Sequence, residues 1–290
     1  MKRIAIAQNT LKILENGCYL SPEGKQVKID RQLASCIAGT AYYEPEALSA
    51  IERDVLSGTP QFSNTEFMVR NETTLVGSER IGRSHKFAKI GVLNFASAKN
   101  PGGGFIKGAQ AQEESLARSS ALYKSLLKCP KYYEYHRSNK SLLYSDRLIY
   151  SPGCSVFRKD DGTLLEEPYL VDFITSCAPN AGQILRQESE STGKIRETLY
   201  GRGAKLLALA VNKGCDALVL GAWGCGVFRN DPSMVAQMFA DFFLLNGKFA
   251  GRFKSVLFSV LDSSEDGRIF AEFDSRFSCN QTNFVRNNES

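Results

Sequence analysis

Two adjacent carboxylates, Glu113 and Glu114, follow a run of three glycines, Gly102–Gly104, at a short distance in the sequence, and Gln112 directly precedes them. A carboxyl group can protonate a leaving oxygen and later take a proton from water, as cleavage of a glycosidic bond requires. Repulsion between the two acids, together with burial, is expected to raise one pKa, which suits an acid. Two acids in the first turn of a helix also stabilise its dipole, so composition alone leaves a purely structural role open.

The elements around the glycine run would bring these groups to a ligand. Residues 87–96 predict an apolar strand, and residues 112–129 predict a helix. Glycine reaches backbone conformations closed to other residues and removes the Cβ that would keep a ligand away. A strand, a glycine-rich loop and a helix in this order often place backbone N–H groups against phosphate.

A second loop of the same kind spans Gly221–Phe228, after an apolar strand at 217–221. Asp231 and Pro232 then predict the start of a helix. The loop lacks the third glycine of the dinucleotide fingerprint and the Lys of a P-loop. Ligands of open α/β sheets bind beyond the carboxyl ends of the strands, so two such loops could hold a diphosphate between them. For either loop the alternative is a tight turn that uses glycine for geometry alone.

Other reactive side chains give weaker signals. His85 and His136 are the only histidines and have polar neighbours, so we expect both at the surface and no His-based triad. Cys225 inside the second loop could be a reactive thiol. The aromatic residues that follow the two glycine runs, Phe105 and Phe228, are expected to contact the ligand.

Composition excludes several classes of protein. The eight cysteines form no CxxC pair or Cys/His cluster, which argues against a metal site and a disulfide scaffold and favours a reducing, cytoplasmic location. The net charge of +5 suits an anionic substrate without requiring nucleic acid. The first residues turn polar too early for a signal peptide, and no run approaches the ~20 apolar residues of a membrane helix. We therefore expect a soluble protein with no membrane partner.

The remaining pattern predicts an α/β fold. Residues 3–16 predict a helix, 18–20 and 26–29 a hairpin, 30–58 further helix and 65–69 a strand, whereas 73–80 is compatible with either strand or helix. Downstream, strands are expected at 147–151, 155–157, 169–177, 217–221 and 253–261, and helices at 184–212, 232–245 and 266–277. Continuously apolar strands require a sheet covered on both faces. We expect an α/β/α sandwich over residues 65–278, an N-terminal helical extension over 1–64 packed on it, and a polar tail over 279–290.

The order Gly102-Gly103-Gly104, seven spacer residues and Gln112-Glu113-Glu114 resembles the signature of poly(ADP-ribose) glycohydrolases, GGG-x(6–8)-QEE. The wider strings 94–98, 101–105 and 109–118 are similar to the compact microbial type, as is the loop 221–228 with Asn230-Asp231-Pro232. The resemblance extends from the N-terminal helices to about residue 275.

This resemblance implies a macrodomain-like three-layer α/β/α fold with a mixed sheet. It also implies hydrolysis of the ribose–ribose O-glycosidic bonds of poly(ADP-ribose), which releases ADP-ribose and needs no cofactor or metal. Glu114 would be the catalytic acid/base, Glu113 would position the ribose hydroxyls, and Gln112 would hold the loop. The ligand-binding residues that it implies are Asn94, Asn100, Gly102, Gly103, Gly104, Phe105, Gln112, Ala222, Gly224, Cys225, Gly226, Val227 and Phe228.

Two other functions share the same pocket. One is a hydrolase of mono-ADP-ribose linked to protein or nucleic acid, and the other is a binding module for ADP-ribose without turnover. The intact glutamate pair argues against the binding module, because a protein that only binds ADP-ribose needs no acid at that place. We expect the protein to cleave the polymer from its terminal unit (exo-action). We also expect it to be a monomer. The sequence leaves open the choice between polymer and mono-ADP-ribosyl substrate, and the role of the N-terminal extension.

Overall fold

The computed structural model describes residues 3–187 and 191–278. Its α-helices are α1 (Arg3–Asn16), α2 (Asp30–Gly39), α3 (Pro45–Ser57), α4 (Thr74–Gly82), α5 (Gln112–Ser119), α6 (Leu122–Leu126), α7 (Pro130–Ser138), α8 (Ala181–Gln187), α9 (Lys194–Asn212), α10 (Pro232–Phe243) and α11 (Arg268–Phe277), and η1 (Phe105–Lys107) is a 3-10 helix. The strands are β1 (Cys18–Leu20), β2 (Gln26–Lys28), β3 (Ala41–Tyr43), β4 (Glu66–Arg70), β5 (Ile90–Phe95), β6 (Leu148–Arg158), β7 (Leu164–Ser176), β8 (Ala217–Leu220) and β9 (Ser255–Ser259).

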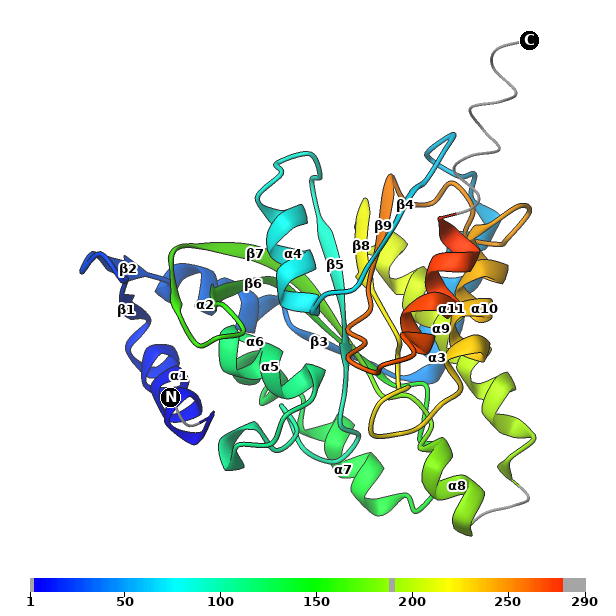
Figure 1. Cartoon of the computed structure of the whole chain (residues 1–290), viewed down its shortest axis with the longest axis horizontal. Coiled ribbons are helices and arrows are strands. Elements are labelled where there is room, and N and C mark those ends of the chain that lie inside the picture. The colour runs from blue at the N-terminus through cyan, green and yellow to red at the C-terminus, as the bar shows by residue number, and fades with distance from the viewer. Residues whose placement is uncertain (1–2, 188–190, 279–290) are drawn as a thin grey trace.

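Seven of these strands form one mixed sheet in the order β3-β6-β7-β5-β8-β9-β4 (Figure 1). Five adjacent strands run parallel to one another, in the order β7-β5-β8-β9-β4. Strand β6 is antiparallel to both of its neighbours, β7 and β3. β1 and β2 form a separate hairpin. The parallel strands β5, β8 and β9 therefore end at the same edge of the sheet, where ligands of such folds bind.

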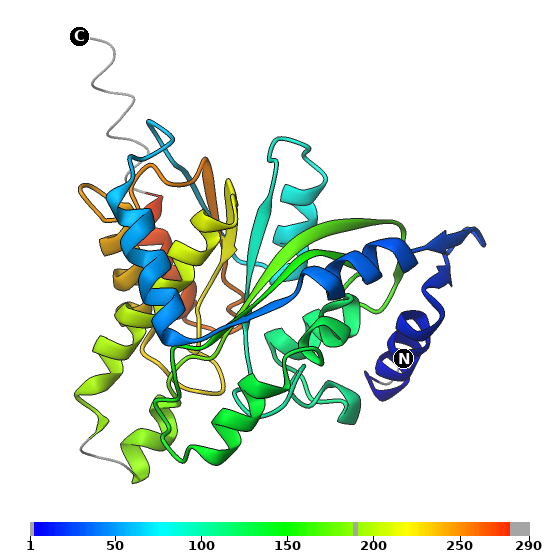
Figure 2. The same cartoon turned by 180° about the vertical axis from the view of Figure 1, so that it is seen from behind.

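Helices cover both faces of the sheet. Helices α3, α9, α10 and α11 lie on one face, and α2, α4, α5 and α6 lie on the other (Figures 1 and 2). Every residue of β8 and β9 is buried, as expected of strands that have helices on both sides. The predicted three-layer α/β/α sandwich with a mixed sheet is confirmed.

The first third of the chain contributes more to the sheet than its composition suggested. Residues 41–43, which we expected to be helical, form β3 and pair with β6. Helix α3 packs against α9. Helix α1 and the β1–β2 hairpin lie at the opposite end of the molecule from α3 (Figure 2). A domain boundary at residue 64 stays a prediction, and the tail 279–290 lies outside the described residues.

One other expectation on local structure is wrong, and one alternative that the sequence left open is decided. The helix expected over 112–129 is broken at Ser120, which has an extended backbone and forms a bridge to Val156 of β6. The ambiguous stretch at 73–80 is helix α4, because the Thr73 side chain accepts a hydrogen bond from the Val76 N–H and caps its first turn. None of the described helices is both long and apolar enough to cross a membrane.

Candidate functional site

A cavity of about 720 Å³ lies beyond the carboxyl ends of the parallel strands. Its walls include the segments that follow β4, β5, β7, β8 and β9, together with Asp160 of the β6–β7 turn, the start of α5 and Ile269 of α11. This size is typical of a site for a small organic ligand, for which about 300–1,000 Å³ is usual. Both glycine loops predicted from the sequence contribute to its wall.

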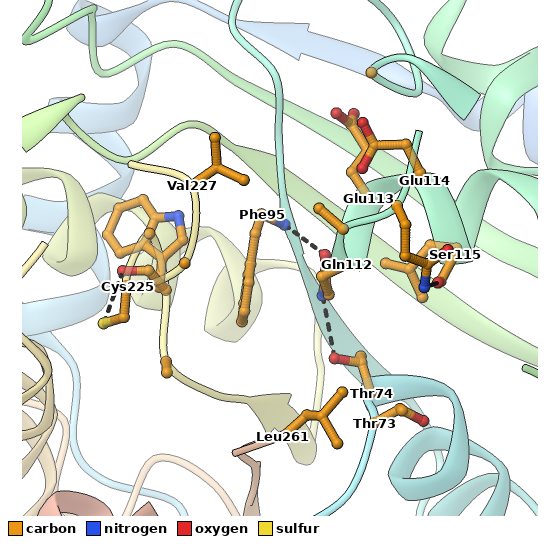
Figure 3. Close-up of a pocket in the computed structure, with 18 of the residues that line it drawn as sticks. Thr73, Thr74, Phe95, Gln112, Glu113, Glu114, Ser115, Cys225, Val227 and Leu261 are labelled. Atoms are coloured by element: carbon orange, nitrogen blue, oxygen red, sulfur yellow. Dashed lines mark hydrogen bonds between the residues drawn. The ribbon is translucent and has the colours of Figure 1, made fainter. Parts of the chain in front are cut away.

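Gln112 fixes the start of α5 against the end of β5. Its Oε1 accepts the Phe95 N–H at 2.9 Å, and its Nε2 donates to Thr74 Oγ1 at 3.2 Å (Figure 3). The same Nε2 also donates to the Leu93 carbonyl at 2.7 Å. The amide thus satisfies two backbone groups of the strand at once. Because Gln112 also lines the cavity, the two glutamates that follow it are placed at the cavity wall.

Glu113 is buried at the cavity wall, with its carboxylate held from both sides. Its Oε2 accepts the Ser97 N–H at 2.6 Å, and its Oε1 accepts from Asn94 Nδ2 at 3.2 Å. Burial raises the pKa of Glu113 to about 8 despite the hydrogen bonds from Ser97 and Asn94, and the nearby Glu114 charge raises it further. Glu113 thus keeps its proton at neutral pH.

Glu114 also lines the cavity but is only partly buried. Its Oε1 accepts the Gly104 N–H at 3.0 Å, so the carboxylate is tied to the glycine run. A Cβ at residue 103 would lie 2.2 Å from the same oxygen, and φ there is +60°. Glycine at this position is therefore required both by the backbone and by the approach of the carboxylate. In Figure 3 the two carboxylates lie side by side, and Val227 lies on the facing loop.

The N–H groups of the first glycine loop are engaged within the protein. The Gly103 N–H donates to the Asn100 carbonyl at 3.0 Å, the Gly104 N–H donates to Glu114, and the Gly102 N–H lowers the pKa of Glu113 by a hydrogen bond. This loop therefore holds the two catalytic candidates rather than presenting a row of open donors.

The second loop is anchored by buried neutral groups. Trp223 is fully buried, and its Nε1 donates to the Ser176 carbonyl at 3.2 Å. Asn230 Nδ2 donates to the Pro179 carbonyl at 2.8 Å and to the Gly224 carbonyl at 3.1 Å. The Asp231 side chain accepts the Ser233 N–H and caps α10, as predicted. These contacts fix the loop from behind and leave its front facing the cavity.

The front of this loop carries open backbone donors. Within residues 224–228, four residues have N–H groups with no hydrogen-bond partner in the described part of the chain: Gly224, Gly226, Val227 and Phe228. All four residues line the cavity. Consecutive N–H groups that face one space form a site for an anionic oxygen. The arrangement can therefore bind phosphate without a Lys or Arg side chain.

Most of the catalytic and ligand-binding residues predicted from the sequence line the cavity. These are Asn100, Gly103, Gly104, Gln112, Glu113, Glu114, Ala222, Gly224, Cys225, Gly226, Val227 and Phe228. Asn94, Gly102 and Phe105 lie behind the wall instead. Asn94 contacts Glu113, and the Phe105 ring packs against Tyr123 with centroids 4.8 Å apart.

Several residues of the cavity wall were not predicted. They are Glu72, Thr73, Thr74, Asp160, Ala178, Ser259, Leu261 and Ile269, among others. Glu72 and Thr73 belong to a polar stretch that follows strand β4. Polar residues directly after a strand could have indicated that they line a site at the end of the sheet. Asp160 carried no signal, because it reaches the wall from the β6–β7 turn through a hydrogen bond with Thr73.

The remaining reactive side chains do not form a nucleophilic site. His85 is exposed as expected, but the expectation is wrong for His136, which is buried on α7 beside Tyr132 and Ser145. Burial lowers the pKa of His136 to about 4, so the imidazole is neutral at pH 7. Burial also raises the pKa of the Cys225 thiol, which disfavours a reactive thiolate. Among the described residues, no group of three or more His, Cys, Asp or Glu is arranged to hold a metal ion.

Comparison with known proteins places this geometry in a family. The family model described as the catalytic domain of microbial-type PARG matches residues 7–159, just over half of the chain. No curated protein matches the chain.

Solved structures give a broader match. The poly(ADP-ribose) glycohydrolase of Thermomonospora curvata is 47% identical with a TM-score of 0.91, over 95% of this chain and 99% of that one. The same enzyme bound to the inhibitor ADP-HPD is 48% identical with a TM-score of 0.86, at the same coverage. The poly(ADP-ribose) glycohydrolase of Deinococcus radiodurans in complex with ADP-ribose is 41% identical with a TM-score of 0.80, over 86% of this chain and 98% of that one. The chain therefore belongs to the family of microbial-type poly(ADP-ribose) glycohydrolases.

Proposed function

We propose that this protein is a glycosidase that hydrolyses the ribose–ribose O-glycosidic bonds of poly(ADP-ribose) and releases ADP-ribose. The observation that carries the proposal is the pairing, across one cavity, of two carboxyl groups with a loop of open backbone N–H groups. The loop suits a diphosphate and the carboxyl groups suit a glycosidic bond. Family membership supports the same activity.

Glu114 is the general acid/base in this proposal. Its carboxyl group lines the cavity, is partly accessible and is fixed by the Gly104 N–H. Cleavage passes through an oxocarbenium-like transition state, so a proton delivered to the leaving 2′-oxygen stabilises the point where charge develops. The same group then takes a proton from the attacking water.

Glu113 is a positioning group in the same proposal. Its carboxyl group is buried and held by Asn94 and the Ser97 N–H, so it cannot move far. With a pKa of about 8 it is protonated at neutral pH, and can both donate to and accept from ribose hydroxyls. A fixed ribose places the glycosidic carbon beside Glu114.

The loop over 222–228 would bind the diphosphate of the same ADP-ribose unit. Its open N–H groups supply the donors, and Phe228 at the cavity wall would contact a ribose. Binding energy from this remote part of the substrate orients the reacting bond. A cavity of this size accepts one ADP-ribose unit, which supports exo-action on the terminal unit of the polymer.

The decisive experiment is product analysis with labelled poly(ADP-ribose), for the wild type and for Glu114→Gln. We expect free ADP-ribose from the wild type from the earliest times, and turnover lowered by about 1,000-fold in the variant. Calorimetry should show that the variant still binds ADP-ribose. Uncleaved polymer with ADP-ribose binding intact would instead indicate a binding module. Release of ADP-ribose only from mono-ADP-ribosylated protein or nucleic acid would indicate the other hydrolase.

A cytoplasmic location and a monomeric state complete the proposal. The location is supported by the seven described cysteines, all of which are free thiols, since a reducing compartment preserves them. Fractionation of the host cell tests the location, and light scattering on the purified protein tests the monomer.

A further inference from the structure

Arg118 is a buried cation one helical turn beyond Glu114, outside the cavity wall. No described carboxylate lies within ion-pairing distance of its guanidinium. Burying an arginine without a salt bridge is costly unless its N–H groups find other acceptors. The acceptors of its N–H groups therefore indicate the structural role of the Arg118 side chain.

The acceptors of the guanidinium lie in the segment that joins the glycine run to α5 and in the first turn of α5. Nη1 donates to the Ala109 carbonyl at 2.7 Å, and Nη2 donates to Gln110 Oε1 and to Ser115 Oγ at 3.3 Å. The planar fork thus ties the loop end to the first turn of α5. Gln110 and Ser115 line the cavity on either side of the glutamate pair. Burial lowers the pKa of Arg118, while the charges of Glu114 and Asp160 raise it.

Helix α1 supports this arrangement from behind. Thr10 on α1 donates its hydroxyl hydrogen bond to the Arg118 carbonyl, and Ala7 forms a small buried cluster with Phe105 and Ala117. A Cβ at Gly108, where φ is +83°, would lie 3.0 Å from the Ile4 side chain. The segment from Phe105 to Gln110 is therefore packed between α1 on one side and the Arg118 fork on the other.

We propose that Arg118 is a positioning residue for glycohydrolysis, which with helix α1 holds the segment 104–111 so that the Gly104 N–H stays on the Glu114 carboxylate. This inference rests on the proposed function and adds a role for the N-terminal helix. The effect acts on the reacting end of the cavity. The loop over 222–228, which would bind the diphosphate, is anchored by Trp223 and Asn230 and does not depend on this fork.

The test compares Arg118→Met with a matched variant, Arg252→Met. Arg252 is also buried, and its guanidinium donates to the Thr59 carbonyl at 2.8 Å and to the Gly58 carbonyl, at the end of the sheet away from the cavity. Steady-state turnover of poly(ADP-ribose), ADP-ribose affinity by calorimetry and the melting temperature are measured for both. We expect Arg118→Met to lower kcat by about 50-fold with ADP-ribose affinity within about threefold, because a displacement of about 1 Å can cost 100-fold.

Arg252→Met should lose comparable stability and keep kcat within about twofold, since it lies far from the reacting groups. Arg118→Lys keeps the charge but loses the fork, so its kcat should fall by about 5- to 10-fold. An Arg118→Met kcat within twofold of wild type, or an equal loss in Arg252→Met, overturns the inference. A wild type that releases no ADP-ribose would instead overturn the proposed function.

A double variant, Gln110→Leu with Ser115→Ala, decides the question if the Arg118 variants do not fold. It removes two of the acceptors from the cavity side and leaves the buried arginine in place. A kcat lowered by about fivefold or more, with ADP-ribose affinity nearly unchanged, supports the inference. Unchanged kcat contradicts it.

Discussion

The two glycine loops that face each other across the cavity use their backbone N–H groups in opposite ways. In the Gly102–Gly104 loop the N–H groups bond to the protein's own carboxylates and to the Asn100 carbonyl. In the loop over 224–228 four N–H groups have no partner in the described part of the chain. Similar composition thus produces a loop that fixes acids and a loop that is open to an anion.

The reason for glycine also differs between the loops. At Gly103 the glycine admits the Glu114 carboxylate, which a Cβ would meet at 2.2 Å. At Gly224 the glycine leaves room for the side chain of Ala178, since a Cβ there would lie 2.4 Å from Ala178 Cβ. Substitutions in the two loops should therefore separate turnover from binding.

Gly103→Ala should act on turnover. The added methyl group displaces the Glu114 carboxylate, so we expect kcat for poly(ADP-ribose) to fall by about 100-fold while ADP-ribose affinity changes by less than about threefold. Gly24→Ala is the matched control, because φ there is +79° but no atom lies within 4 Å of its Cβ. Equal losses of kcat in the two variants would show that backbone strain alone explains the effect.

Glu113→Gln should change how stability depends on pH. The folded state keeps the Glu113 proton up to a pKa of about 8, whereas the unfolded chain loses it near 4.5, so stability falls as pH rises between these values. The variant has no such proton and so lacks this loss of stability. The difference in free energy of unfolding, variant minus wild type, should therefore increase by about 2 kcal/mol or more between pH 4.5 and pH 8.5. Urea unfolding at several pH values measures it, and parallel curves for the two proteins would contradict the raised pKa.

Gly224→Ala should act on binding. Its Cβ would press on Ala178 and on Asn230 Nδ2, and the loop would have to shift its open N–H groups. We expect the Kd for ADP-ribose to rise by about 10-fold, which is about 1.4 kcal/mol, with a smaller change in kcat. Gly214→Ala has the same φ of +75° with no atom near its Cβ and serves as the control. A fall in kcat without a change in Kd would remove the distinction between the loops.

Val227→Ala should have the smallest effect. The side chain of Val227 is 78% exposed, and the contribution assigned to this residue is its backbone N–H. Truncation leaves that donor in place, so the Kd for ADP-ribose should change by less than about threefold. Calorimetry measures this change, and a larger loss would mean that the valine side chain itself binds the ligand.

The sequence predicted the fold well where one pattern dominated. Apolar strands at 217–221 and 253–261 and the capped helix after Asp231 are close to the observed β8, β9 and α10. The prediction was wrong at β3, because a strand of three residues between two helices is too short to show an alternation of apolar and polar side chains. Such a strand is specified by its pairing with β6, which is a tertiary contact.

The candidate site was predictable to the extent that its residues are contiguous in sequence. Both glycine loops and the glutamate pair are contiguous, and most of their residues line the cavity. Asp160 and Ile269 reach the wall only through folding, so no local pattern could identify them. The burial that separates Glu113 from Glu114 was also beyond the sequence, because neighbouring residues on a helix point in different directions. The catalytic roles of the pair stay predictions.

The pairing of β4 with β9 has a consequence for synthesis of the protein. Glu66 pairs with Ser255, so a strand made early has no partner until nearly all the described chain has been made. Until then β4 and one edge of β8 expose unpaired backbone groups, which invite association with other chains. Parallel pairing over such a distance is also slow. The wall of the cavity that contains Thr74 and Leu261 would therefore be completed last, and glycohydrolase activity would appear only when the whole sheet has closed.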